Sequence, residues 1–403
     1  MTALRTGETR AAEQLQGQAG PSGPPDIAIL VYCLEGGGVQ RQTLTLAAHF
    51  AARGLRVAYV VVRATGELAS SVPPNVELVE LLPGRGQKKP TILDRIVDQV
   101  RALPALTAYL RQARPVTVLT GGSHMNFSAV VTHRRARSTA HLVLRLTTHM
   151  SHARGRFNPI RWLSSVAASS FYPYADRIVA VSEDVRSDFL EMVKYDPARI
   201  EMIREPVITP RIGQLMDEAA PHPWLAPGQP PVILAIGRIS VQKDFETLVR
   251  AFAEVRRQRP ARLIILGSAV NSGGAVRLVN LARALGVASD IDFPGYTMNP
   301  YTYLARAAVF ALSSRFEGCP NVLAEAIYCG CPIVATDCPG GIREVVSDEN
   351  LGTLVPVADI AAMGGALLAA IGRGRTTACR VCPQGFDVET SVARYLAVCR
   401  SEA

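Results

Sequence analysis

Short apolar runs alternate with segments of helical periodicity along almost the whole 403-residue chain. Apolar runs of this kind, bounded by turn residues, are typical of strands buried on both faces of a parallel sheet. Strict alternation of strand and helix predicts right-handed strand–helix–strand units, and therefore an α/β fold. We expect strands near residues 27–32, 56–62, 76–81, 116–120, 141–146, 177–181 and 200–203, and then near 232–236, 262–266, 291–293, 308–312, 332–336 and 353–355.

The chain is long enough for two such domains. The segment 209–231 is rich in proline and lacks periodicity, which predicts a linker. We therefore expect a first Rossmann-like domain over 26–208, a second over 232–385, and a C-terminal helix within 386–403. Residues 1–25 are rich in Gly, Ala, Gln and Pro and lack the apolar core of a signal peptide, so we interpret them as a disordered leader.

Two carboxylates flank the predicted start of a helix within 316–344. Glu317 lies in a strand-to-helix loop, and Glu325 follows in the first turns of the helix, with seven residues between them. A helix N-terminus offers N–H groups and a positive dipole end, which together attract phosphate. The carboxylates can then accept hydrogen bonds from sugar and ribose hydroxyls. For this spacing alone, a surface loop before an ordinary helix is the plain alternative. The intervening residues expected to contact the ligand are Gly318, Cys319, Pro320, Asn321 and Val322.

Two cations follow the first strand of the predicted second domain. Gly237 and Arg238 come directly after the apolar run 232–236, and Lys243 lies five residues beyond Arg238. Both side chains can reach a diphosphate at the carboxyl end of that strand, Arg as a planar fork and Lys as a point charge. Taken alone, two solvated surface cations would be the simpler interpretation.

A glycine-rich turn follows the first strand of the chain, at Gly36, Gly37 and Gly38. Glycines in such a turn let the backbone approach a ligand closely. A nicotinamide-binding domain is one alternative, but it expects G-x-G-x-x-G and an acidic residue at the end of the second strand, where this chain has Arg63. A flexible turn without a ligand is another.

The carboxylate and cation segments, in this order, resemble the signatures of the retaining glycosyltransferases of family 4. The resemblance is specific in 232–250 and 293–344 and looser before residue 205. It implies the GT-B fold, in which two Rossmann-like domains face each other across a cleft. It also implies that the C-terminal helix crosses back to the first domain.

The resemblance also assigns roles to individual residues. It implies that Glu325 binds the ribose of a nucleotide-sugar donor and that Glu317 lies beside the donor sugar. Arg238 and Lys243 would neutralise the leaving nucleotide diphosphate. The glycine pair of the first loop in the family faces the donor phosphates, and it maps here to Gly37 and Gly38.

Two histidines lie in loops that are expected to matter for catalysis. His124 follows the fourth strand, and His149 follows the fifth. Relatives place a histidine in the second of these loops, near the donor sugar and the acceptor. His149 is either that group displaced by one residue or only its neighbour, since this chain has Thr147 and Thr148 directly after Arg145. We keep both as catalytic candidates, with His149 preferred.

The formal net charge of +9 is unevenly distributed. Residues 85–161 hold 14 Lys and Arg against two acids, Asp94 and Asp98. Such a density indicates an anionic partner, although a solubilising surface is the plain alternative. We prefer an anionic membrane surface or a lipid-diphosphate acceptor to nucleic acid, because the chain lacks an aromatic RNA-binding signature, a helix-turn-helix pattern and a zinc finger.

The sequence therefore predicts a hexosyl-type glycosyltransferase that is cytosolic or peripheral at the inner membrane leaflet. It would use a nucleotide-sugar donor, with UDP as the nucleotide by resemblance, and a glycan or lipid-linked glycan acceptor. We expect no cofactor and no essential metal, since the two cations would carry the diphosphate charge. The alternatives are an epimerase or a phosphorylase of the same architecture, and a non-catalytic protein that binds anionic surfaces.

Overall fold

The computed structural model describes residues 23–84, 91–153, 170–220, 222–267, 272–348, 350–375 and 382–400. Most of the predicted leader lies outside this range. The chain divides into two compact units. The first unit comprises Met1–Pro206 with Glu389–Ala403, and the second comprises Val207–Val388.

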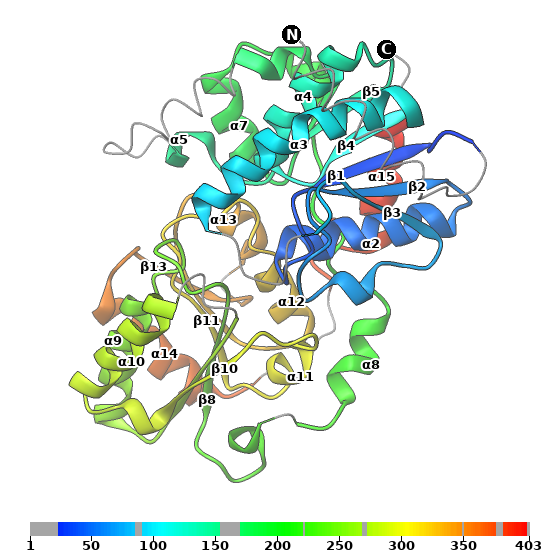
Figure 1. Cartoon of the computed structure of the whole chain (residues 1–403). Helices are drawn as coiled ribbons and strands as arrows, with labels where there is room; N and C mark the ends of the chain where they lie inside the picture. Colours follow the sequence, from blue (N-terminus) through cyan, green and yellow to red (C-terminus); the bar gives the residue numbers. More distant parts are fainter. Residues whose placement is uncertain are drawn as a thin grey trace. The chain divides into compact units, whose positions relative to one another are not determined.

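The described residues of the first unit build one parallel sheet in the order β3-β2-β1-β4-β5-β6-β7 (Figure 1). Its strands are β1 Ile27–Val31, β2 Val57–Val61, β3 Val76–Glu80, β4 Thr117–Thr120, β5 His141–Leu146, β6 Arg177–Ala180 and β7 Ile200–Met202. The α-helices are α2 Gly38–Ala52, α3 Ile92–Ala113, α4 Ser123–Ala136, α5 Met150–Ala153, α7 Glu183–Met192 and α15 Val388–Arg400. Short 3-10 turns lie at Ala69–Ser71, Tyr172–Tyr174 and Pro197–Arg199.

The second unit has a parallel sheet in the order β10-β9-β8-β11-β12-β13. Its strands are β8 Val232–Ile236, β9 Arg262–Leu266, β10 Ile291–Gly295, β11 Val309–Leu312, β12 Ile333–Thr336 and β13 Thr353–Val355. The α-helices are α8 Arg211–Asp217, α9 Phe245–Gln258, α10 Ser272–Ala284, α11 Tyr301–Leu304, α12 Asn321–Tyr328, α13 Ile342–Val345 and α14 Ile360–Arg373. Short 3-10 turns lie at Pro223–Leu225 and Ala288–Asp290.

Each unit buries its sheet between helices, which explains the continuous apolar strands. In the second unit Ile233 and Ala235 of β8 pack in a cluster with Phe252 of α9 and Leu367 of α14. Leu234, on the opposite face of the same strand, belongs to a second cluster that includes residues of α8 and α12. Side chains of a strand alternate between faces, so both faces of a parallel sheet must be apolar. The predicted α/β class with two Rossmann-like units is confirmed.

The segment predicted as a linker, 209–231, is part of the second unit. It contains α8, and its Ile212, Met216 and Leu225 are buried in the core of that unit. Ile212 and Met216 have the i, i+4 spacing of a helix, but α8 is short and the rest of the segment is rich in proline, which is why the sequence indicated a linker. At the other end of the chain, α15 packs on the first unit, where the hydroxyl of Thr117 donates to the carbonyl of Cys399 at 2.9 Å.

Both sheets reverse their strand order at one point. The reversal lies between β1 and β4 in the first unit and between β8 and β11 in the second. In open α/β sheets, ligands bind outside the carboxyl ends of the strands at this switch point. The loops that follow these four strands carry most of the residues predicted for the site.

Candidate active site

At the switch point of the second unit, the loop after β8 and the loop after β11 meet. Nζ of Lys243 lies 2.5 Å from Oε1 of Glu317. The same carboxylate oxygen accepts a hydrogen bond from Oγ of Ser314 at 2.5 Å. Both partners of the ion pair are largely buried, with side-chain exposures of 18% for Lys243 and 8% for Glu317. The structure therefore brings together a predicted cation and a predicted carboxylate, and it adds Ser314, which sequence reasoning missed.

A glycine after β12 fixes the backbone of Glu317. The amide of Glu317 donates to the carbonyl of Pro339 at 2.8 Å. Gly340 has φ +115°, and a Cβ built there would lie 1.9 Å from the carbonyl oxygen of Glu317. Only glycine satisfies both the left-handed conformation and the close approach. The Pro-Gly-Gly run after β12 thus positions the loop that carries the carboxylate.

The second carboxylate lies within α12 and has a separate partner. Glu325 is buried, and its Oε1 accepts a hydrogen bond from the hydroxyl of Tyr301 at 3.0 Å. Tyr301 begins α11 and was not predicted as a site residue.

A cysteine thiol after β12 lies close enough to Glu317 to feel its charge. Burial, together with the charge on Glu317, raises the pKa of the Cys338 thiol to about 12, so this thiol stays protonated.

The residues between the carboxylates form the entry to α12. Gly318 and Pro320 are buried, whereas Cys319 and Val322 are half-buried. The amides of two residues at this helix start donate to local carbonyls, Asn321 to Cys319 at 2.9 Å and Leu323 to Pro320 at 2.8 Å. The expected row of free amides is therefore partly occupied.

Two of the predicted donor-binding residues have polar groups in contrasting surroundings. Oδ1 of Asn321 is buried and has no hydrogen-bond partner within the part of the chain that the structure describes. A buried acceptor without a partner is costly unless something else satisfies it. Arg238, after β8, is exposed. Both were predicted to bind the donor.

In the first unit, the glycine turn after β1 is held by ion pairs and hydrogen bonds. Glu35 accepts from Nη2 of Arg95 on α3 at 2.7 Å, and the amide of Gly36 donates to Glu67 at 2.9 Å. Gly37 is the residue before α2 and has φ −101°, which any residue can adopt. A Cβ at Gly37 or Gly38 would meet only flexible glutamine side chains. Backbone strain therefore does not require these two glycines, and their proposed contact with phosphate stays a prediction.

The two histidine loops lie side by side at the carboxyl ends of β4 and β5. The amide of Thr147 donates to Oγ of Ser123 at 3.0 Å, which joins them. His124 lies in the first turn of α4 and is exposed. The loops are thus brought together, although the two histidines have different surroundings.

His149 is buried and faces two carboxylates of α7. Nε2 lies 3.0 Å from Oδ2 of Asp184, and Nδ1 lies 3.5 Å from Oδ1 of Asp188. Burial alone would lower the pKa of His149, but the hydrogen bond with Asp188 and the charge of Asp184 outweigh it, so the pKa is raised. Asp188 also accepts from the amide of Met150 at 2.6 Å. This geometry suits a clamp between the loop and α7.

A buried arginine ties the same loops to distant parts of the first unit. Arg145 of β5 is fully buried, and its Nη1 donates to the carbonyl of Gly121 at 2.8 Å. Its Nη2 pairs with both oxygens of Glu205 at 2.5 and 2.6 Å, and its Nε donates to the hydroxyl of Tyr395 on α15 at 3.0 Å. Sequence reasoning did not identify this cluster, because its members come from three separate regions of the chain.

Two family models match the chain. The model described as "Glycosyltransferase Family 4" matches residues 36–211, and the model described as "Glycosyl transferases group 1" matches residues 230–372. Together they include all the predicted site residues. The chain belongs to glycosyltransferase family 4. The family predicted from the carboxylate and cation segments is thereby confirmed.

Curated relatives of this family 4 chain are named as glycosyltransferases. It is 29% identical over 235 residues to an N-acetylgalactosamine-N,N'-diacetylbacillosaminyl-diphospho-undecaprenol 4-alpha-N-acetylgalactosaminyltransferase of Campylobacter jejuni, a match that covers 58% of this chain and 60% of the relative. It is 32% identical over 196 residues to a D-inositol 3-phosphate glycosyltransferase of Salinispora tropica, covering 45% of this chain and 40% of the relative. The matches thus span about half of these relatives' length.

Solved structures extend the likeness of the fold to almost the whole chain. The HepE protein of Anabaena, in complex with UDP and glucose, matches with a TM-score of 0.70 and 18% identity. The match covers 94% of this family 4 chain and 100% of that one. At this identity the likeness concerns the fold alone, and it is the GT-B fold expected from the sequence.

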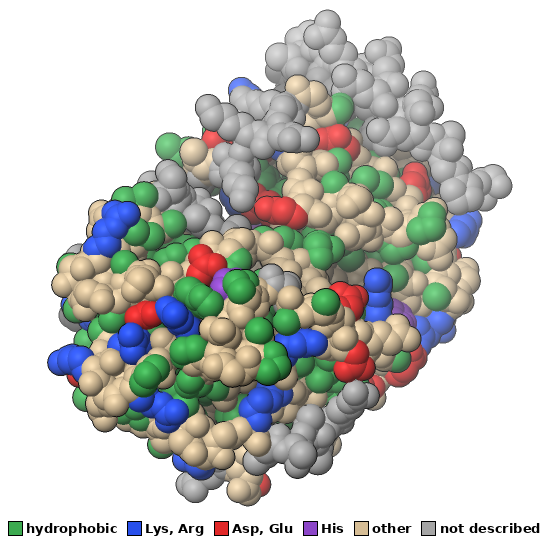
Figure 2. Space-filling view, turned by 90° about the horizontal axis from the view of Figure 1, so that it is seen from below, with side chains coloured by type: hydrophobic (Ala, Val, Ile, Leu, Met, Phe, Trp, Pro, Cys, Tyr) green, Lys and Arg blue, Asp and Glu red, His purple; other side chains and the backbone are tan. Residues whose placement is uncertain are grey.

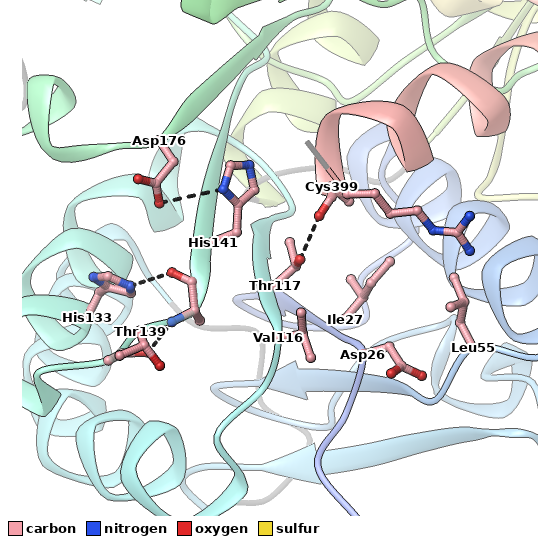
Figure 3. Close-up of a pocket in the computed structure, with 13 residues that line it drawn as sticks. Asp26, Ile27, Leu55, Val116, Thr117, His133, Thr139, His141, Asp176 and Cys399 are labelled. Carbon is pink, nitrogen blue, oxygen red and sulfur yellow. Dashed lines mark hydrogen bonds and ion pairs between the residues drawn. The ribbon is translucent and has the colours of Figure 1, made fainter. Parts of the chain in front are cut away.

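A pocket of about 680 Å³ lies away from the predicted site, at the edge of the first sheet where β1, β4 and β5 begin. Ile27, Thr117 and His141 line it together with Cys399 and Asp176. Figure 3 shows the ring of His141 and the carboxylate of Asp176 pointing toward each other, with 3.9 Å between Nδ1 and Oδ2. No residue predicted for the active site lines this pocket.

Within the described residues, no group of three or more His, Cys, Asp or Glu is arranged to hold a metal ion. Across those same stretches of the chain, none of the helices is both long and apolar enough to cross a bilayer.

Proposed function

We propose that this protein transfers a sugar from a nucleotide diphosphate sugar to a hydroxyl of a glycan or lipid-linked glycan, with retention of the anomeric configuration. UDP is the proposed nucleotide. The observation that carries the proposal is the juxtaposition of Lys243 and Glu317 at the switch point of the second unit, with Arg238 exposed in the same loop as Lys243. Membership of family 4 supports it, since relatives of the chain are named as glycosyltransferases.

In the proposed reaction, substrates and protein side chains account for every bond and proton, without a cofactor. The bond between the anomeric carbon and the diphosphate oxygen breaks, and its electron pair leaves with the nucleotide diphosphate. The acceptor hydroxyl bonds to the anomeric carbon on the same face, and its proton passes to the departing diphosphate. Arg238 and Lys243 stabilise the charge that develops on the leaving group, as preorganised cations do most effectively in a partly dry site. The carboxylate of Glu317 stabilises the positive charge on the sugar.

The other residues are assigned to binding. Glu325, positioned by Tyr301, accepts hydrogen bonds from the ribose hydroxyls, and Asn321 contributes its buried Oδ1 to the donor. Gly37 and Gly38 are proposed to contact the donor phosphates. Because both ring nitrogens of His149 face carboxylates of α7, we assign it to positioning of its loop and keep His124 as the histidine that faces the substrate.

A panel of nucleotide sugars offered with and without glycan or lipid-linked acceptors tests this function. We expect a glycosylated product that requires an acceptor, keeps the anomeric configuration of the donor, and forms in the presence of a chelator. An epimerised donor without acceptor would indicate the epimerase alternative. Phosphate-dependent breakdown of a glycan would indicate a phosphorylase. Vesicle binding without any turnover or nucleotide binding would indicate the non-catalytic alternative.

A further inference from the structure

The outer face of the first turns of α3 is apolar and exposed. Leu93, Ile96, Val97 and Val100 have exposures of 73%, 47%, 43% and 60%. Their spacing of i, i+3, i+4 and i+7 places them along one face of the helix, so they form a stripe, here called the α3 stripe. Single exposed apolar residues need no explanation, but a contiguous apolar face usually marks an interaction site.

The inner face of the same turns is fixed by polar contacts. Asp98 pairs with Nε and Nη2 of Arg63 at 2.6 and 2.7 Å and accepts from the hydroxyl of Tyr32 at 3.1 Å. Arg95 pairs with Glu35, next to the glycine turn. A rotation of α3 that buried the stripe would break the buried pair of Asp98, which is strongly unfavourable. The exposure of the α3 stripe is therefore built into the unit.

Basic residues outnumber acids in the segment 85–161, which contains the α3 stripe. The two acids within 85–161 both lie on α3, and both are engaged: Asp94 caps the helix with Thr91, and Asp98 pairs with Arg63. Arg101, Arg111 and Arg114 are exposed on or just after α3. On the face of the molecule drawn in Figure 2, basic, acidic and apolar side chains are interspersed among the described residues.

We propose that the α3 stripe docks on the surface of an anionic phospholipid bilayer, with its apolar side chains in the interfacial region and the neighbouring arginines at the headgroups. A few apolar side chains combined with basic residues suffice for reversible interfacial binding. A stable dimer would need about 800 Å² and roughly 20–30 residues on each partner, far more than four side chains. This inference rests on the proposed function, because docking would bring the protein to a lipid-linked acceptor.

Co-sedimentation of the full chain with phosphatidylcholine vesicles, with and without phosphatidylglycerol, tests the docking. We compare wild type with two double variants, Ile96→Gln with Val100→Gln, and Leu93→Gln with Val97→Gln. Val276→Gln is the matched control, since Val276 is 55% exposed on α10 of the other unit. We expect anionic vesicles to bind wild type and the control equally, and each double variant about tenfold more weakly, because each removes two apolar groups from the interface. Added salt should weaken binding of wild type.

Equal binding of wild type and both double variants would overturn the proposal, as would equal binding of wild type to neutral and anionic vesicles or no binding at all. A dimer in solution that the double variants dissociate would assign the face to a second copy of the chain. Thermal stabilisation by UDP, measured in the same preparations, tests the glycosyltransferase proposal separately from the docking proposal. If UDP stabilises every variant, loss of docking leaves the proposed function standing. If UDP stabilises none while vesicles bind, the proposed function fails alone.

Discussion

Lys243 and Glu317 form an ion pair with 2.5 Å between Nζ and Oε1, although they lie 74 positions apart in the sequence. The cation assigned to the leaving diphosphate is thus held by the carboxylate assigned to the sugar. A bound diphosphate must compete with Glu317 for Lys243, and the carboxylate is then free to face the sugar. We therefore expect substitution of Glu317 and substitution of Glu325 to have different effects on UDP binding and on turnover.

Glu317→Gln should bind UDP at least as tightly as wild type, because it removes the anion that competes for Lys243. Its turnover should fall, since the developing charge on the sugar loses its partner. Glu325→Gln should instead weaken UDP binding, because the ribose is present in donor and product alike. Calorimetry with UDP and turnover assays measure both. Identical profiles for the two variants would contradict the division of roles.

Gly340→Ala should lower turnover as well as stability. The new Cβ would collide with the carbonyl of Glu317, and a displacement of about 1 Å at a reacting group can cost on the order of a hundredfold in rate. Gly286→Ala is the matched control, because Gly286 also has a positive φ of +71° but a Cβ there meets nothing within 4 Å. Equal turnover in the two variants would show that the contact does not position Glu317.

Arg145→Ala should destabilise the first unit strongly. It leaves the carboxylate of Glu205 buried without its charge partner, which typically costs about 3–5 kcal/mol. The control is Arg53→Ala, which removes an exposed ion pair with Glu389 and should cost below about 1 kcal/mol. Chemical denaturation measures both free energies of unfolding. Replacing Arg145 and Glu205 together by leucine should recover much of the loss, and failure to do so would show that the charges themselves are needed.

The clamp of His149 should make stability depend on pH. The pKa of His149 is raised above its ordinary value of 6.5, so the imidazolium contributes stability fully below about pH 6.5 and loses it as pH rises through the folded-state pKa. The pKa of Asp188 is lowered: burial opposes the shift, but hydrogen bonds with His149 and Ser151 outweigh it, so the contribution of Asp188 is lost at strongly acidic pH. The difference in unfolding free energy between wild type and His149→Gln, measured from pH 4 to 9, should shrink as pH rises. A difference independent of pH would contradict the clamp.

The sequence predicted features that depend on local pattern. Runs such as 27–31 and 232–236 are apolar throughout because both faces of a parallel strand are buried, so the strands and the α/β class could be predicted. Lys243 and Glu317 were identified because each lies in a recognisable segment. Their pairing could not be predicted, since it depends on how two loops meet at the switch point.

Other features escaped prediction for physical reasons. Tyr301, on a separate short helix, donates a hydrogen bond to Glu325, and no local sequence pattern predicts such a contact. Asp184 and Asp188 share one face of α7 by their spacing, but the sequence does not indicate that His149 lies against them. Ile212 shows the same limit for packing, because a few scattered apolar residues in a proline-rich segment fill a core only when the neighbouring sheet is in place.

The affinity for UDP of Lys243→Ala and Arg238→Ala, measured by calorimetry beside wild type, tests the proposed diphosphate site directly. Arg277→Ala is the control, since Arg277 is an exposed cation on α10 of the same unit. Loss of one charge-assisted contact to the diphosphate should weaken binding by about 1–3 kcal/mol, or roughly 5- to 150-fold, in each site variant and leave the control unchanged. Unchanged UDP affinity in both site variants would contradict the assignment of this switch point as the diphosphate site.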